Sequence, residues 1–262
     1  MSRDHASVLV EAFELLENEE YRKAAAVLET AGREDAQAQA LLGMLYWHGH
    51  LGEDMAAASA IRWYAAAAEN GHGLAQIWLA NNYLVGLRTE ADPKLAVYWY
   101  GKAACQGITQ AKYQLGLCYA SGWGTERDLA KALALMQEAA EKNFFEADLF
   151  LLEHSAAAQG CADPSLLERV EEKYRSKLRK NEGMALRYVD LLLHSGKAEE
   201  NRAYQLLTDW DVFRTERGEL LRADCLANGW GVERDIPAAA AIYRKFPDSR
   251  HARSKLKLLL GE

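Results

Sequence analysis

One hairpin pattern returns along this chain, and the repetition restricts what the chain can fold into. The clearest copy, residues 110–143, reads QAKYQLGLCYASGWGTERDLAKALALMQEAAEKN. Two stretches with apolar and small residues at helical spacing flank the loop Gly122-Trp123-Gly124, where glycine permits the backbone angles of a tight turn. Asp128 is placed to cap the second helix. One such hairpin cannot bury its own apolar side, so it requires neighbouring copies.

The chain supplies those copies at a nearly constant period. The loop glycines Gly49, Gly86 and Gly122 are 37 and 36 residues apart. The loop sequence GWGTERD at Gly122 returns as GWGVERD at Gly229, which is 107 residues later and close to three periods. A fixed period of this length predicts a solenoid, in which each repeat contacts only its neighbours.

The repeated residues resemble a known family. The pattern A-x3-L-G-x2-Y-x2-G-x-G-x3-D, followed by an alanine-rich helix ending in Gly or Asn, is similar to the Sel-1-like repeat of the tetratricopeptide superfamily. The resemblance is specific over residues 36–143, recognisable over 218–243 and weak over 144–215. It implies a right-handed α-superhelix that binds other proteins on its inner surface, and it does not name the partner.

These observations predict an all-α fold, a right-handed α-solenoid of about six to seven helix-turn-helix repeats. We expect one elongated domain over residues 1–262. Its predicted parts are an N-terminal capping hairpin at 1–35, three strong repeats at 36–143, degenerate repeats at 144–215, and a last repeat with a C-terminal capping helix at 216–262.

Several packing roles follow from the pattern. One small residue in each first helix lets the two helices of a hairpin approach closely: Gly43, Ala80 and Gly116. Trp63 and Trp99 are one period apart, and we expect both in the core. The loop glycines Gly122 and Gly229 should have a positive φ or lie against a neighbouring backbone.

The candidate binding site is the concave groove, which the first helix of each hairpin lines in tetratricopeptide-like folds. The motif residues occupy the core, so the remaining positions of these helices should point into the groove. In the strong repeats the candidates are Met44, Trp47, His48, Ile77, Trp78, Asn81, Tyr113, Gln114 and Leu117. Weaker repeats add Arg187, His194 and Asp224. Large aromatic groups at such positions are typical binding anchors.

Charge and composition limit the partner. The net charge of −7 and the pI near 5.6 argue against nucleic acid as the partner, because binding nucleic acid selects for a basic face.

No run of eighteen apolar residues is present, so we expect no membrane span. No signal peptide is recognisable, which favours the cytoplasm. The four cysteines have no regular spacing, so we expect buried reduced thiols at Cys118 and Cys225.

The residues give no support for catalysis, a cofactor or a metal. The histidines of His48-Gly-His50, close to Glu53 and Asp54, have the chemistry of a metal site, but a polar loop tip explains them more simply. The favoured function is therefore a non-enzymatic adaptor, regulator or inhibitor of bacterial type, which binds a protein or peptide segment.

Two alternatives remain. The resemblance allows an enzyme-like role or binding of cell wall or β-lactam, as in some family members. The acidic N-terminal hairpin and the basic last helix also allow head-to-tail self-assembly, so the oligomeric state is left open.

Overall fold

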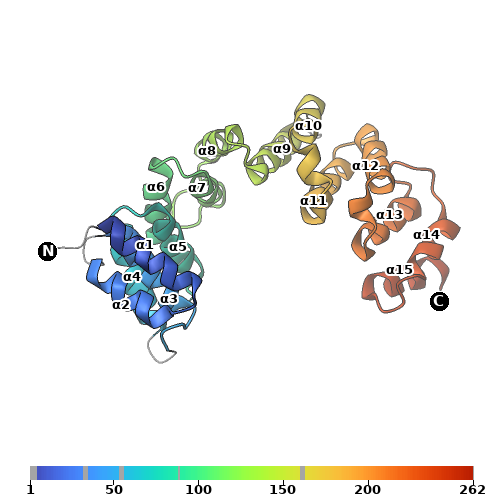
Figure 1. The fold of residues 1–262 in the computed structure, drawn as a ribbon. Helices are drawn as coiled ribbons and strands as arrows, with labels where there is room; N and C mark the ends of the chain where they lie inside the picture. The colour runs from blue at the N-terminus through green and yellow to red at the C-terminus, as the bar shows by residue number, and fades with distance from the viewer. Residues whose placement is uncertain (1–4, 32–34, 53–55, 88, 160–162, 262) are drawn as a thin grey trace. The chain divides into compact units, whose positions relative to one another are not determined.

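The computed structural model of this chain describes residues 5–31, 35–52, 56–87, 89–159 and 163–261. Within these ranges the regular structure is entirely helical, with fifteen α-helices and one short 3-10 turn, and no strand occurs. Consecutive helices pair as α1–α2 through α13–α14, followed by α15 (Figure 1). The predicted all-α solenoid of helical hairpins is confirmed.

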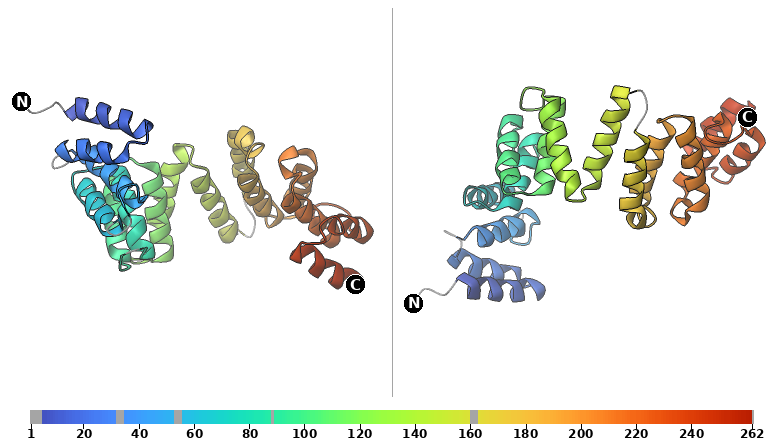
Figure 2. Two further views of the ribbon diagram at one scale, coloured as in Figure 1. Left: turned by 60° about the horizontal axis from the view of Figure 1, so that its bottom comes forward. Right: turned by 90° about the horizontal axis from the view of Figure 1, so that it is seen from above.

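The contacts divide the chain into two compact units, Met1–Ala147 and Asp148–Glu262. In the first unit, consecutive helices lie side by side in chain order (Figure 2). Its helices are α1 (His5–Glu17), α2 (Tyr21–Ala31), α3 (Ala36–Trp47), α4 (Ala56–Glu69), α5 (Gly73–Val85), α6 (Pro93–Cys105), α7 (Thr109–Ser121) and α8 (Leu129–Glu141). The described helices of this unit form four consecutive hairpins. The predicted single domain, with its capping hairpin, strong repeats and degenerate repeats, stays a prediction.

The second unit continues with hairpins whose sequences diverge from the motif. Its helices are α9 (Phe145–Gln159, which begins three residues before the unit), α10 (Pro164–Leu178), α11 (Glu182–Leu193), α12 (Lys197–Asp209), α13 (Glu216–Asn228), α14 (Ile236–Tyr243) and α15 (Arg250–Leu260). A 3-10 turn at Asp211–Phe213, which the sequence did not predict, joins α12 to α13. None of the helices in the described ranges has the length and apolarity to cross a membrane.

In two of the three strong repeats, a glycine on the first helix faces a large buried residue on the second helix. A Cβ at Gly43 would lie 2.9 Å from the ring of Tyr64, and a Cβ at Gly116 would lie 2.8 Å from Cε of Met136. Both large side chains are buried. The predicted close approach of paired helices is confirmed at these two glycines.

Trp63 and Trp99 were predicted to lie in the core, but they are less buried than expected. Trp63 and Trp99 are only half-buried, whereas the next residues, Tyr64 and Tyr100, are buried at 9 % and 0 % exposure. Adjacent positions of a helix point about 100° apart. The tyrosines face the first helix of their own hairpin, and the tryptophans pack partly on the preceding repeat; Trp63, for example, lies against the apolar cluster around Leu28 and Leu42.

The loop between the paired helices follows the predicted geometry. Gly122 and Gly229 end α7 and α13 in the left-handed region, with φ of 76° and 75°. The close approach falls on the second glycine of each loop instead. A Cβ at Gly124 would lie 2.1 Å from the carbonyl oxygen of Pro93, at the start of α6. The loop of one repeat therefore rests directly on the backbone of the preceding repeat.

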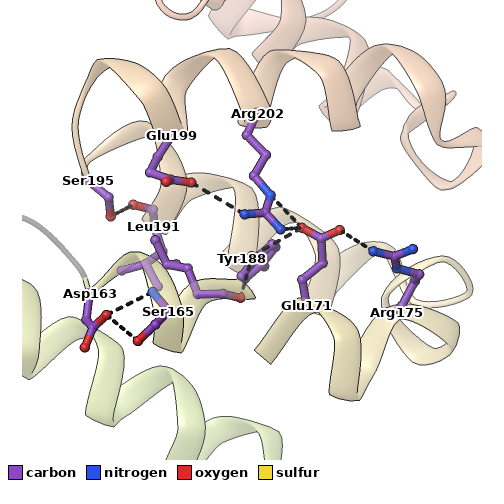
Figure 3. A network of polar contacts seen from close by, with 10 residues as sticks. Asp163, Ser165, Glu171, Arg175, Tyr188, Leu191, Ser195, Glu199 and Arg202 are labelled. Atoms are coloured by element: carbon purple, nitrogen blue, oxygen red, sulfur yellow. Dashed lines mark hydrogen bonds and ion pairs between the residues drawn. The ribbon is translucent and has the colours of Figure 1, made fainter. Parts of the chain in front are cut away.

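A polar network replaces part of the motif packing in the divergent hairpins (Figure 3). The Glu171 carboxylate on α10 is buried and accepts from Arg202 of α12, at 2.8 Å from Nε and 2.7 Å from Nη2. Tyr188 of α11 donates to Leu167 O at 3.0 Å and approaches the same carboxylate at 3.4 Å. One buried charge thus joins three consecutive helices.

Some basic residues of α10 also form ion pairs with buried carboxylates. Lys173 donates to the buried Asp148 carboxylate at 2.9 Å, and Tyr174 donates to the same oxygen at 2.6 Å. Arg175 lies 3.4 Å from Glu171. Three further basic residues, at 177, 179 and 180, are exposed.

Candidate partner-binding site

The predicted site residues come from the first helices of the three strong repeats. Their exposure differs. Asn81 and His48 are exposed, and the half-buried residues are Met44, Trp47, Trp78, Tyr113, Gln114 and Leu117. We call these eight residues, with the helices α3, α5 and α7 that carry them, the first-helix face.

Ile77 does not belong to this face. Its side chain is 4 % exposed and packs in the cluster that contains Tyr100 and Leu115. The expectation that Ile77 points into a groove is therefore corrected. The reason is geometric: Ile77 and Trp78 are adjacent on α5, so when one reaches the surface the other turns toward α6.

Two aromatic residues of the first-helix face meet across neighbouring repeats. The rings of Trp47 on α3 and Trp78 on α5 are 4.7 Å apart and pack edge to face, at 87°. Trp78 also stacks on Tyr64, with centroids 3.9 Å apart. Further along the face, Tyr113 lies 5.1 Å from Phe144. Each contact leaves part of the indole or phenol surface exposed, which is what a binding anchor requires.

A polar residue beside the indoles is held in place by the core. Tyr100 donates to the Asn81 side-chain oxygen at 2.5 Å, so the Asn81 amide group keeps its two donors facing solvent, without a partner among the described residues. The neighbouring Asn82 is buried and donates to Trp78 O. Of these two asparagines, Asn81 is the one whose amide donors can reach a partner's backbone.

The same hydrogen bond returns in the second unit. Asp224 stands five residues before the loop glycine Gly229, as Asn81 stands five residues before Gly86. Tyr243 follows Asp224 at the interval that separates Tyr100 from Asn81, and it donates to Asp224 at 2.7 Å. The second repeat and the last repeat therefore place a polar side chain at an equivalent point of the first helix.

Around Asp224 the second unit has a cavity of about 600 Å³. It is lined by residues of α11, α13 and α15: Leu186, Arg187, Asp190, Glu216, Arg217, Leu220, Leu221, Asp224 and His251. Arg187 and Asp224 were predicted from the sequence as groove residues, and His194 is not among the lining residues. The repeat position of Asp224 was the signal for this site; nothing in the sequence pointed to Arg217 or His251.

Charge inside the cavity is unevenly compensated. The Asp224 carboxylate accepts from His251 Nε2 at 2.9 Å and lies 3.0 Å from Lys255 Nζ. Burial, helped by this carboxylate, raises the pKa of Tyr243, which stays a neutral donor. Arg187 and Arg217 line the cavity together with three leucines and form no ion pair among the described residues. Asp190 and Glu216 add acidic groups to the same lining.

Metal-binding side chains are not clustered in the part of the chain that the structure describes. No cluster of three or more metal-binding side chains occurs there. His48 and His50 have ring centroids 5.9 Å apart, and Glu53 and Asp54 lie outside the described residues. Burial raises the pKa of the Cys118 thiol to about 11 and that of Cys225 to about 12, so both stay protonated near neutral pH, as expected of buried cysteines.

Comparison with known proteins agrees with this fold. A Sel1 repeat protein from Oxalobacter formigenes superposes with a TM-score of 0.53 and 25% identity, over 94% of this chain and 84% of that chain. The protective antigen c5321 of uropathogenic Escherichia coli, which displays an SLR fold, superposes with a TM-score of 0.54 and 20% identity. That superposition covers 90% of this chain and 59% of the antigen. No match is found among curated proteins.

The family model for the Sel1 repeat matches residues 36–72, 73–108, 109–144 and 218–246. These segments make up more than half of the chain and coincide with the hairpins α3–α4, α5–α6, α7–α8 and α13–α14. Sel1 repeats generally mediate interactions between proteins. The chain belongs to the Sel1 repeat family.

Proposed function

We propose that this chain is a non-enzymatic binding protein, an adaptor, regulator or inhibitor, whose first-helix face receives a segment of a partner protein. The observation that carries the proposal is the pair of half-buried indoles, Trp47 and Trp78, which touch across two repeats and keep part of their surface exposed. Half-exposed tryptophans beside a fixed polar group are the usual centre of a protein-binding surface.

The chemistry of the face suits an extended segment. The indoles offer apolar surface, and the free amide donors of Asn81 suit backbone carbonyl groups of the partner. Because the hydrogen bond from Tyr100 already holds the Asn81 side chain in place, Asn81 loses little conformational entropy when a partner binds.

The cavity of the second unit supports the same function independently. The leucines of its lining suit an apolar side chain, and Arg187 and Arg217, which form no ion pair among the described residues, suit a carboxylate. A segment that carries an apolar residue next to an acidic one is therefore the occupant that this cavity favours.

Two tryptophan variants test the proposal by affinity capture from source cells. Trp78→Ala should lose at least about thirtyfold in affinity for the captured protein, since a central aromatic anchor contributes about 2 kcal/mol or more. Trp99→Ala is the matched control, because Trp99 is also half-buried in the same apolar cluster but lies on the second helix of its hairpin.

Both variants should melt at a lower temperature than the wild type, because each removes part of a packed indole. Only Trp78→Ala should lose capture. If Trp78→Ala captured the partner as well as Trp99→Ala does, the partner would bind at another surface, and the proposed face would be refuted.

A further inference from the structure

The exposed side of α1 carries an ordered stripe of apolar and acidic residues. Val10, Phe13, Glu14 and Glu17 follow the i, i+3, i+4, i+7 spacing of one helix face. Val10 is 58% exposed and Phe13 is 45% exposed, while Val8 and Ala12 on the other side are buried. Along the helix, the apolar pair comes first and the acidic pair comes last.

The exposed side of α15 carries the complementary stripe in the opposite order. Arg250, Arg253, Lys257 and Leu258 are all exposed and share one face. The helix contains no acidic residue, and Leu258 is 80% exposed. Here the basic residues come first and the apolar residue comes last.

The charged members of both stripes form no ion pairs with the residues that the structure describes. Glu14, Glu17, Arg250, Arg253 and Lys257 have no side-chain ion pair among the described residues. Lys255, on the inner side of α15, is used differently, since it lies 3.0 Å from Asp224. The outward charges are therefore not needed for the packing of α15 on its own unit.

We propose that α1 of one copy packs antiparallel on α15 of a second copy. In that orientation the acidic pair of α1 meets the arginines of α15, and Val10 and Phe13 meet Leu258. A parallel arrangement would set acidic residues against the apolar end and arginines against Phe13. Charge and apolar order thus select both the partner, a second copy, and the direction of the contact.

This contact joins two different surfaces, so it is heterologous. Such a contact extends into a chain of copies unless the rotation between them closes a ring. The contact leaves the first-helix face of every copy unused, so self-association and partner binding are separate properties.

The test is sedimentation of the full chain over a concentration series, from about 5 µM to about 500 µM, as a small interface requires. The average mass of the wild type should rise with concentration and fall at high salt, because exposed charges are screened. A wild type that stays monomeric throughout would overturn the proposal.

Charge-reversal variants identify the faces. Glu14→Lys with Glu17→Lys makes both stripes basic, and Arg250→Glu with Arg253→Glu makes both acidic. Each double variant alone should associate at least about tenfold more weakly than the wild type. A mixture of the two double variants should regain association, because each acidic stripe then finds a basic one.

The matched control is Glu168→Lys with Glu172→Lys, an equal change of charge on the exposed side of α10. It should associate as the wild type does, and helical circular dichroism should be unchanged in every variant. Association that survives both stripe reversals, or that is not restored in the mixture, would show that copies meet through another surface.

Discussion

Replacing Gly124 with alanine should destabilise the first unit far more than the same change at Gly122. The two residues share one loop and one conformation, since φ is 76° for both. They differ in the space available to a side chain. A Cβ at Gly122 would meet its nearest atom at 3.4 Å, whereas a Cβ at Gly124 would lie 2.1 Å from the Pro93 carbonyl oxygen.

The magnitudes follow from these contacts. The left-handed conformation costs an alanine about 1–2 kcal/mol, partly offset by the lower entropy of the unfolded chain, so Gly122→Ala should lose about 1 kcal/mol. Gly124→Ala adds the displacement of the loop from the backbone of the preceding repeat, typically about 1–3 kcal/mol for an overpacked site. The total for Gly124→Ala is about 2–4 kcal/mol.

Urea unfolding followed by circular dichroism measures both variants against the wild type. Gly231→Ala and Gly229→Ala repeat the comparison in the second unit, where a Cβ at Gly231 would lie 1.9 Å from the Glu200 carbonyl oxygen. If substitution of the first and the second glycine of a loop lowered the free energy of unfolding equally, the contact between the loop and the preceding repeat would not stabilise the fold, which would contradict the prediction.

Three further results are expected. Glu171→Gln should lower the free energy of unfolding, measured in urea, by about 2–3 kcal/mol. This is less than the loss for a fully buried ion pair, because the Arg202 side chain keeps 29% exposure. A loss under about 0.5 kcal/mol would show that the network does not stabilise the fold. Tyr100→Phe should cost about 1 kcal/mol through the lost hydrogen bond to Asn81, read from the same unfolding curves, and a neutral result would show that the bond contributes nothing. At pH 8 a thiol reagent should modify the exposed Cys105 and should not modify Cys118, because burial raises the pKa of the Cys118 thiol to about 11. Peptide mapping of the labelled protein measures both sites. Rapid labelling of Cys118 in the native protein would contradict its burial.

The repeat pattern predicted most of the fold because each hairpin has its own local signals. Loop glycines, capping residues such as Asp92 and Asp128, and small residues such as Gly116 act within one hairpin or between neighbours. Local signals of this kind can be read without knowing distant contacts.

Other features depend on which side of a helix faces which neighbour, and these were harder to predict. Spacing alone could not decide between Trp99 and Tyr100 for the buried position, or between Ile77 and Trp78 for the surface. The Glu171 carboxylate takes its partners from three helices, so no local pattern reveals it.

The first-helix face was predicted by assigning the motif residues to the core and the remaining positions to the surface, an assignment that failed at Ile77 even in an intact repeat. In the divergent repeats the same reasoning named Arg187 and Asp224, which line the cavity, but it did not name Arg217, which lines the cavity as well. The equivalence of Asn81 and Asp224 needed the hydrogen bonds of Tyr100 and Tyr243 to become visible.

Site-specific photo-crosslinking in source cells tests the central claim most directly. A photoreactive residue at Asn81, on the first-helix face, is compared with one at Gln137, an exposed position on α8, the second helix of its hairpin. Binding on the first-helix face predicts a crosslinked partner polypeptide from position 81 and none from position 137. A partner captured from position 137 alone would contradict it.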